Sequence, residues 1–197
     1  MKRSEQKAAT RAAILDLASR RLRAEGLAGN GVQRLMRDLG LTHGGFYVHF
    51  PSKQALDAAA LEAAMAERAQ RLDALPQALT RAERRKLRAR RYLSRQHRDH
   101  PEAGCPLAAL ASEAPRAGAE VRDAFQRMLA EVVTDGDNPQ DPAPPSEELA
   151  LLALAAGGLA LARAVPDPAL SDAILAACRD AAGRLADAYA DIQGDPQ

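Results

Sequence analysis

Residues 42–53 gather a large share of the aromatic and hydrogen-bonding side chains of this chain. The segment holds three of the six aromatic residues of the sequence and two of its four histidines. Two glycines among them would let the backbone approach a ligand closely. Hydroxyl, imidazole and backbone N–H groups donate hydrogen bonds to phosphate oxygens and base edges, so this set indicates contact with a polyanion. Its members are Thr42, His43, Gly44, Gly45, Phe46, Tyr47, His49, Phe50 and Lys53.

The sequence contains no recognisable set of catalytic residues. His43 and His49 have no Cys or acid at ligand spacing, so we expect no metal at them. We find no pair of carboxylates, no nucleophile with a histidine and an acid, and no glycine-rich phosphate loop. The sequence therefore predicts a protein that is not an enzyme and needs no cofactor.

Apolar periodicity predicts three helices around this segment. They span about residues 10–23, 32–39 and 43–48, with apolar residues spaced three and four apart. Gly26 and Gly40 fall just past the first two helices, where a left-handed cap belongs, and Thr42 is a good N-cap for the third. Two short helices joined by a tight glycine turn form a helix-turn-helix unit. Such a unit places the start of its second helix against base edges in the major groove.

Residues 26–53, GLAGNGVQRLMRDLGLTHGGFYVHFPSK, resemble the DNA-binding domain of the TetR/AcrR family of bacterial regulators. The resemblance is carried by Gly26, Val32, Leu35, Gly40, Thr42, Gly44, the cluster Tyr47-x-His49-Phe50 and Lys53. It implies DNA contact by Thr42, His43, Gly44, Gly45 and Tyr47 on the recognition helix, by Gln33 and Arg34 before it, and by Lys53 at a phosphate. Two features depart from the family: Asn30 and Gly31 replace the usual Thr-Ser pair, and Gly45 lacks a base-reading side chain.

A structural role competes with DNA contact at several of these positions. Phe46 and Phe50 are expected in the core, because large apolar side chains are mostly buried. The hydroxyl of Tyr47 is expected to reach a phosphate while its ring packs. His49 fits either a core hydrogen bond or a DNA contact, and both interpretations stay open.

The net charge of +1 conceals a strong asymmetry along the chain. Residues 1–53 carry 10 Lys/Arg against 4 Asp/Glu, residues 54–98 carry 11 against 5, and residues 99–197 carry 6 against 17. This pattern suggests that only the basic first half of the chain binds a polyanion. A basic and an acidic surface that are merely solvated, with no partner, would give the same distribution of charge. Nine Lys/Arg in residues 81–98 lie on nearly every face of one predicted helix, so we expect that helix to pair with the acidic C-terminal half.

The whole chain is predicted to be all-α, with about nine helices, because it is rich in alanine and only 3% aromatic. Further helices are expected at about 53–75, 81–98, 107–114, 118–134, 146–165 and 169–192, with a loop at 135–145. We expect residues 1–52 to form the helix-turn-helix domain and residues 53–197 an effector-binding and dimerisation domain. The longest charge-free run, residues 149–162, is too short to span a bilayer, no secretory signal is visible, and two cysteines make no disulfide framework. A cytoplasmic protein without membrane contact is expected.

The last two predicted helices are candidates for a dimer interface. Helix 146–165 is apolar almost all round and must be buried on most sides, and its small residues 155–158 give a flat patch. Packed against their symmetry mates, the two helices would form an isologous four-helix interface, and the resemblance implies the same homodimer. The alternative is that these helices form part of the core of a single chain, and Cys178 in particular is expected to be a core residue. The candidates are Leu152, Ala156, Gly157, Leu159, Ile174, Cys178 and Leu185.

The resemblance also implies a pocket for an unknown small-molecule effector among the middle helices. Its candidate lining residues, which the sequence does not separate from core filler, are Leu93, Leu107, Leu110, Phe125 and Met128. Cys105 lies just before a predicted helix start with Pro106 at its first position, a place that favours a thiolate. Gly104-Cys105 followed by residues 107–113 resembles TetR-family repressors that respond to electrophiles or oxidants through cysteine. An inert, partly buried thiol is the alternative.

We therefore expect a homodimeric, ligand-responsive regulator that binds a palindromic double-stranded DNA operator as a repressor and is released by a small molecule. An electrophile-sensing or redox-sensing repressor acting through Cys105 is one alternative. A helical interaction module without DNA binding is the other.

Overall fold

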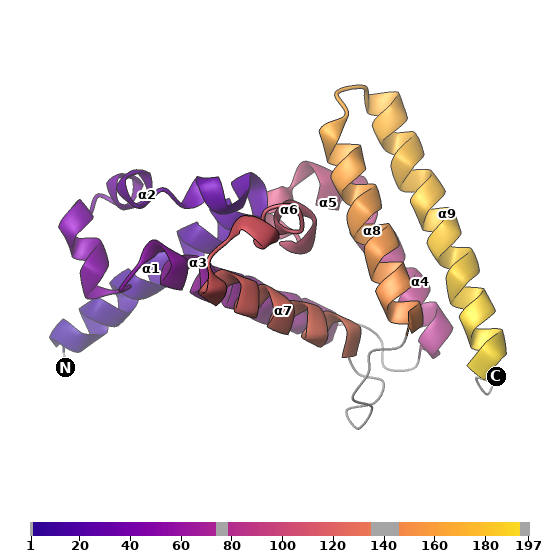
Figure 1. Ribbon diagram of the computed structural model, residues 1–197, viewed down its shortest axis with the longest axis horizontal. Helices are drawn as coiled ribbons and strands as arrows, with labels where there is room; N and C mark the ends of the chain where they lie inside the picture. The colour runs from indigo at the N-terminus through magenta and orange to yellow at the C-terminus, as the bar shows by residue number, and fades with distance from the viewer. Residues whose placement is uncertain (1, 74–78, 135–145, 194–197) are drawn as a thin grey trace. The chain divides into compact units, whose positions relative to one another are not determined.

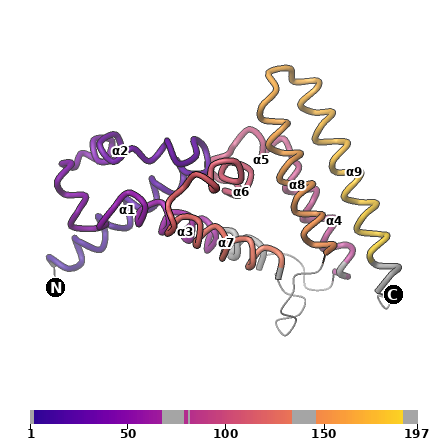
Figure 2. Tube along the Cα trace, viewed as in Figure 1, coloured from indigo at the N-terminus to yellow at the C-terminus, as the bar shows by residue number. Residues whose placement is uncertain are grey.

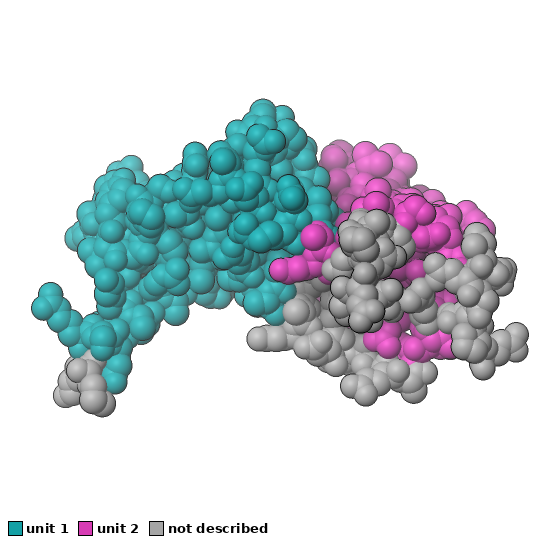
Figure 3. All heavy atoms as spheres, turned by 60° about the horizontal axis from the view of Figure 1, so that its bottom comes forward, with its two compact units in different colours: residues 1–70, 101–129 teal, residues 71–100, 130–197 magenta. Residues whose placement is uncertain are grey.

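The computed structural model describes residues 2–73, 79–134 and 146–193, and within these ranges it contains helices and no strand. The predicted all-α class is confirmed. The chain divides into two compact units, one combining residues 1–70 and 101–129, the other residues 71–100 and 130–197 (Figure 3). A functional boundary between residues 52 and 53 is a different kind of division and stays a prediction.

The first unit begins with α1 (Lys2–Glu25), η1 (Gly26–Asn30), α2 (Val32–Asp38) and η2 (His43–Val48) (Figure 1). It also contains α3 (Lys53–Asp73) as far as residue 70, then η3 (Pro101–Ala103), α6 (Leu107–Leu110), η4 (Ala114–Arg116) and α7 (Ala119–Thr134) as far as residue 129. Here α denotes an α-helix and η a 3₁₀-helix. The helix expected over residues 107–114 is thus a single α-helical turn followed by a separate 3₁₀ turn.

The core of this unit follows the predicted apolar faces. Ile14, Ala18 and Leu22 lie on one side of α1 and are fully buried. Phe46 and Phe50 are buried too, which confirms their predicted core role, and their rings stack with centroids 5.8 Å apart. The helix α1 begins at residue 2 instead of residue 10, because its first turns consist of good helix formers with no apolar stripe for periodicity to detect.

Two glycines and one threonine shape the turns of the helix-turn-helix, as predicted. Gly26 and Gly40 both have φ of +69°, the left-handed conformation that ends a helix at low cost only with glycine. Thr42 caps the next element, since its Oγ1 accepts a hydrogen bond of 3.3 Å from the backbone N–H of Gly45. That element, η2, has the predicted bounds but is a 3₁₀-helix.

The second unit is built on three long helices. It contains α4 (Arg81–Tyr92), α5 (Arg95–Asp99), α8 (Ser146–Ala164) and α9 (Pro168–Gln193). Figures 1 and 2 show α8 and α9 running antiparallel side by side. A hydrogen bond of 2.6 Å from Ser171 Oγ to the carbonyl of Ala162 joins the two helices near their turn. A Cβ on Gly158 would come 2.6 Å from the sulfur of Cys178, so this glycine lets α8 and α9 pack closely.

The start of α4 is as predicted, but its end is not. Thr80 and Glu83 form the expected capping box, with Thr80 Oγ1 accepting from the Glu83 N–H at 3.2 Å and Glu83 Oε2 accepting from the Thr80 N–H at 2.9 Å. The single helix expected over residues 81–98 is wrong, since the chain leaves the helix after Tyr92. Ser94 caps α5 by accepting a hydrogen bond of 3.1 Å from the N–H of His97, so a new helix begins there. The predicted loop at residues 135–145 and the tail from residue 194 lie outside the described residues.

Candidate nucleic-acid interface

The exposed side of η2 carries the residues predicted to read DNA. His43 and Gly44 are exposed, and the Tyr47 side chain is 60% exposed although its ring packs edge-on against that of Phe46, with centroids 5.3 Å apart. The ring of His43 also meets Tyr47 edge-on, with centroids 5.9 Å apart. The buried Phe46 therefore supports an exposed pair of hydrogen-bonding aromatic rings. Sequence reasoning missed that Val48 beside them is 60% exposed, an apolar group available to a thymine methyl.

Glycine leaves the start of η2 open to a large ligand. A Cβ on Gly44 would meet no atom within 4 Å, so its backbone is accessible. A Cβ on Gly45 would lie 3.3 Å from Thr42 Oγ1, so Gly45 is half-enclosed by the cap. Thr42 itself is exposed, and its hydroxyl keeps a proton to donate while it accepts from Gly45.

Two predicted contacts lie on the exposed face of α2. Gln33 is exposed and is available to a base or phosphate. Arg34 is also exposed, but its guanidinium hydrogen-bonds both carboxylate oxygens of Glu25, at 2.6 and 3.2 Å. This hydrogen bonding raises the pKa of Arg34 above its ordinary value. A phosphate would have to compete with Glu25 for this guanidinium.

Lys53 is held by its own unit. Its Nζ donates to the carbonyl of Leu27 at 2.9 Å and pairs with Asp57 Oδ2 at 2.6 Å, and its side chain is 41% exposed. Asp57 also accepts a hydrogen bond of 2.9 Å from Asn30 Nδ2, a residue that is fully buried. Burial raises the pKa of Asp57 above its ordinary value, although the hydrogen bonds from Lys53 and Asn30 act in the opposite direction. An ammonium has three protons to donate, so one remains for a phosphate.

His49 lies at the end of η2, where the structure places it partly inside the unit. Its backbone N–H donates to the carbonyl of Phe46 at 2.9 Å. The side chain is half-buried, and its Nδ1 is hidden from solvent with no hydrogen-bond partner. Both interpretations of His49 therefore stay predictions.

A contact that sequence reasoning missed ties residues after α6 to the turn before α2. Glu113 Oε2 accepts a hydrogen bond of 2.8 Å from the backbone N–H of Leu27. A Cβ on Gly26 would come 2.2 Å from Glu113 Oε1, so a larger residue here would adopt an unfavourable φ and would also displace the Glu113 carboxylate. No periodic pattern marks such a contact between a loop carboxylate and a backbone group.

The predicted effector residues are divided between the units. Leu107, Leu110 and Met128 are buried in the first unit, whereas Leu93 is fully buried in the second. Phe125 is half-exposed and lines a hollow of about 580 Å³ in the first unit, formed by residues between 111 and 129. Cys105 is buried, with 8% of its surface exposed, and α6 beyond it is too short to have the dipole expected to favour a thiolate.

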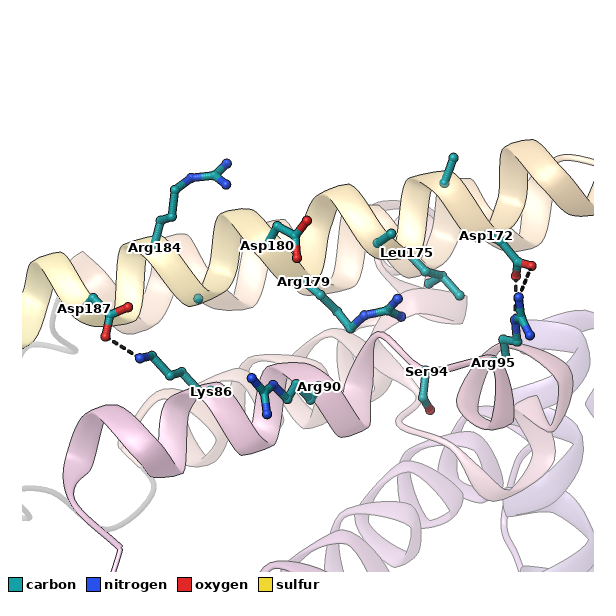
Figure 4. A pocket seen from close by; sticks show the side chains of 13 residues that line it. Lys86, Arg90, Ser94, Arg95, Asp172, Leu175, Arg179, Asp180, Arg184 and Asp187 are labelled. Atoms are coloured by element: carbon teal, nitrogen blue, oxygen red, sulfur yellow. Dashed lines mark hydrogen bonds and ion pairs between the residues drawn. The ribbon is translucent and has the colours of Figure 1, made fainter.

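The second unit has a larger groove between α4 and α9, with a volume of about 990 Å³ (Figure 4). Ion pairs bridge it at both ends, Lys86 with Asp187 and Arg95 with Asp172. Arg179 projects between the two helices, where it donates a hydrogen bond of 2.6 Å to the carbonyl of Leu93. The basic helix therefore pairs with acidic residues of the C-terminal half, as its charge predicted.

The predicted dimer residues occupy two different environments in the second unit. Ala156 and Leu159 are buried within the chain, and Cys178 packs against Gly158. Gly157 is exposed, and Leu152, Ile174 and Leu185 are partly exposed. Three further leucines, which were not predicted to lie in the interface, are exposed: Leu149 by 45%, Leu161 by 61% and Leu170 by 50%.

The described residues offer neither a metal site nor a membrane-spanning helix. They contain no group of three or more His, Cys, Asp or Glu side chains placed to hold a metal ion. None of the helices in these ranges has both the length and the apolar character needed to cross a membrane.

An exposed recognition element that follows a glycine-capped helix defines a helix-turn-helix DNA-binding regulator. Residues 14–60 match the family model described as bacterial regulatory proteins, tetR family, which identifies this part of the chain as a TetR-family helix-turn-helix domain. No curated protein matches the chain.

Solved structures share its fold across nearly the whole chain. NemR of E. coli in its reduced form is 22% identical, with a TM-score of 0.70, over 88% of this chain and 94% of that one. A TetR-family transcriptional regulator from Cytophaga hutchinsonii is 22% identical, with a TM-score of 0.67, over 93% and 96% of the two chains. A TetR transcriptional regulator from Chloroflexus aurantiacus is 20% identical, with a TM-score of 0.72, over 91% and 95%.

Proposed function

We propose that this regulator is a homodimeric repressor that binds a palindromic operator and leaves it when a small molecule binds. The observation that carries the proposal is the exposed face of η2. There Tyr47 and His43 present hydrogen-bonding groups beside the open backbone of Gly44, supported from below by the buried Phe46. This arrangement suits insertion into a major groove, with the Tyr47 hydroxyl at a phosphate or a base edge.

Exposed apolar surface on α8 and α9 supports the dimer. Leu149 and Leu161 on α8 and Leu170 on α9 expose much of their side chains, and the exposed Gly157 and Ala177 would let another helix come close. Such surface is costly in water, and a second copy of the same helices would cover it in an isologous interface. Two recognition elements related by a two-fold axis would then match two halves of a palindrome.

The proposal is tested by a gel-shift titration against the DNA upstream of the gene, at several salt concentrations, with sedimentation of the free protein. A specific, salt-dependent shift by a dimer is expected. Lys53→Met combined with Asp57→Asn, so that no buried carboxylate is left alone, should weaken binding to all sequences and lower the slope of log K against log salt by about one unit, because one phosphate contact is lost. Arg116→Met, which removes an exposed charge on η4, is the matched control. A monomer without specific binding contradicts the proposal.

A second candidate function is redox or electrophile sensing through Cys105. It is favoured by the likeness to NemR, whose structure is of a reduced form, together with a cysteine, Cys105, that is in no disulfide. In the tested variant, Cys105→Ser, DNA binding should persist while release by N-ethylmaleimide is lost. Cys178→Ser is the matched control. Release that persists in Cys105→Ser contradicts this candidate.

A further inference from the structure

Arg85 of α4 is a buried charge that is only partly neutralised. The residue is 5% exposed, and its Nε donates a hydrogen bond of 2.6 Å to Glu148 Oε1 in the first turn of α8. Both terminal nitrogens, Nη1 and Nη2, are hidden from solvent, and neither has a hydrogen-bond partner. One end of the guanidinium is therefore paired, and the four N–H donors at its other end meet no acceptor among the described residues.

Such an arrangement favours a partner other than the residues that the structure describes. A buried donor without an acceptor loses its hydration and gains nothing, and the loss is greatest for a charged group. Native proteins satisfy nearly all such groups, and the exceptions mark ligands, ions or ordered water. Arg85 therefore differs from Arg90 of the same helix, which is exposed to water in the groove of Figure 4.

The surroundings of Arg85 favour an anion. The helix α4 contains seven Lys/Arg and one Glu, so the local potential is positive even after Glu148 has paired with Arg85. The ring of Tyr189 on α9 lies 5.9 Å from Arg85 Cζ and offers an aromatic surface beside the guanidinium. Figure 1 shows α4 beside α8 and α9, the helices that supply these neighbours within the second unit.

We propose that Arg85 binds the carboxylate of a small acidic ligand through its two free terminal nitrogens. The two oxygens of a carboxylate match the spacing of Nη1 and Nη2, whereas a phosphate dianion would cost more to desolvate in a buried position. With Tyr189 beside the site, the ligand class is a carboxylic acid with an apolar or aromatic body. The inference rests on the proposed function, because it identifies this acid as the small molecule that releases the repressor.

The test measures carboxylate binding to the full chain in carboxylate-free buffer. The first probe is ¹³C-formate, followed by NMR line broadening, because formate contains little beyond the carboxylate and should fit whatever the ligand's body. The second probe is benzoate, with benzamide as its neutral isostere. Wild-type protein should bind formate with a millimolar dissociation constant and benzoate more tightly, and it should not bind benzamide.

Variants of Arg85 separate a ligand site from a structural ion pair. Arg85→Met combined with Glu148→Gln removes both charges, so no buried carboxylate is left alone, and it should abolish formate binding. Arg85→Lys keeps the charge but loses the two parallel terminal nitrogens of the guanidinium, so this variant should bind formate at least about tenfold more weakly. Arg90→Met removes an exposed charge from the same helix and should bind formate like wild type. Thermal unfolding shows whether each variant is folded.

Two results would overturn the inference. In the first, wild type binds neither probe, as expected if ordered water satisfies Arg85. In the second, the variant Arg85→Met with Glu148→Gln binds formate as well as wild type does. Gel shifts with benzoate distinguish this failure from failure of the proposed function. If the protein binds carboxylate at Arg85 but never binds DNA, the proposed repressor function is wrong and the proposed carboxylate site stands. If the protein binds DNA specifically but binds no carboxylate, only the proposed carboxylate site is wrong.

Discussion

The carboxylate of Glu113 holds the backbone N–H of Leu27, 86 residues earlier in the chain, at 2.8 Å. Lys53 Nζ holds the carbonyl of the same residue at 2.9 Å. Both backbone groups of Leu27 are thus fixed by side chains from distant parts of the first unit. Since Leu27 lies in η1, directly before α2, these two bonds set how the chain enters the helix-turn-helix.

Gly26 is expected to be more sensitive than Gly40 to the same substitution. Gly40→Ala places a Cβ at φ of +69° in open space, which should lower the free energy of unfolding by about 1–2 kcal/mol. Gly26→Ala has the same φ and drives its Cβ into Glu113, so its loss should exceed that of Gly40→Ala by about 1 kcal/mol or more. Urea unfolding of the two variants measures the difference. Equal losses would show that Glu113 moves aside without cost.

Tyr47→Phe should weaken operator binding without affecting the fold. The substitution removes one hydroxyl from a side chain that is 60% exposed, and the ring contact with Phe46 remains. We expect about 3- to 10-fold weaker binding in fluorescence anisotropy, as for the loss of one hydrogen bond, and a stability change within about 0.5 kcal/mol. Tyr189→Phe on α9 is the control and should bind DNA like wild type. Unchanged affinity in Tyr47→Phe would remove this hydroxyl from the interface.

Asp57 is expected to make stability fall as pH rises. Burial is the largest influence on this group, and it raises the pKa of Asp57 in the folded state above its ordinary value of 3.8. The folded protein then binds the proton more tightly than the unfolded chain, so stability from this group is present below about pH 4 and is lost as pH rises through the folded pKa. Asp57→Asn lacks this contribution. In urea unfolding at pH 4 to 7, the stability of wild type relative to Asp57→Asn should therefore decline with rising pH, and a difference that stays constant or grows would refute the raised pKa.

Leu161→Glu should break the dimer without unfolding the chain. Leu161 on α8 is 61% exposed, so a charge there disturbs little within the chain but would be buried in the proposed interface. We expect a dimer dissociation constant at least about 100-fold higher, as for a buried unpaired charge, with helical content retained by circular dichroism. Ala111→Glu, an exposed site in the first unit, is the control. A dimer as tight as wild type would place the interface elsewhere.

Local sequence signals predicted much of the fold because the residues involved interact within a few positions of one another. The apolar face of α1, the glycine caps at 26 and 40, and the Thr80–Glu83 capping box are all short-range features. The missed break after Tyr92 has a local signal too, because Ser94 is a helix-capping residue. The run of arginines on both sides of it favoured a continuous helix.

Long-range contacts between polar groups were out of reach. Nothing in the sequence indicates that Asn30 meets Asp57, or that Arg85 pairs with Glu148 across 63 positions. The residues expected to contact DNA remain predictions at the level of single side chains. The structure adds that Arg34 and Lys53 already have acidic partners, which no reading of spacing alone could tell.

Because Glu113 and Lys53 grip the main chain of Leu27, the connection does not depend on which side chain occupies position 27. Exchange of leucine for another amino acid would leave both bonds possible, with proline as the exception, since proline has no N–H to offer Glu113. A survey of tolerated substitutions would therefore find that position 27 accepts most amino acids but not proline. Substitutions at Glu113 and Lys53, which hold its backbone, would be the ones that reveal how much this connection matters.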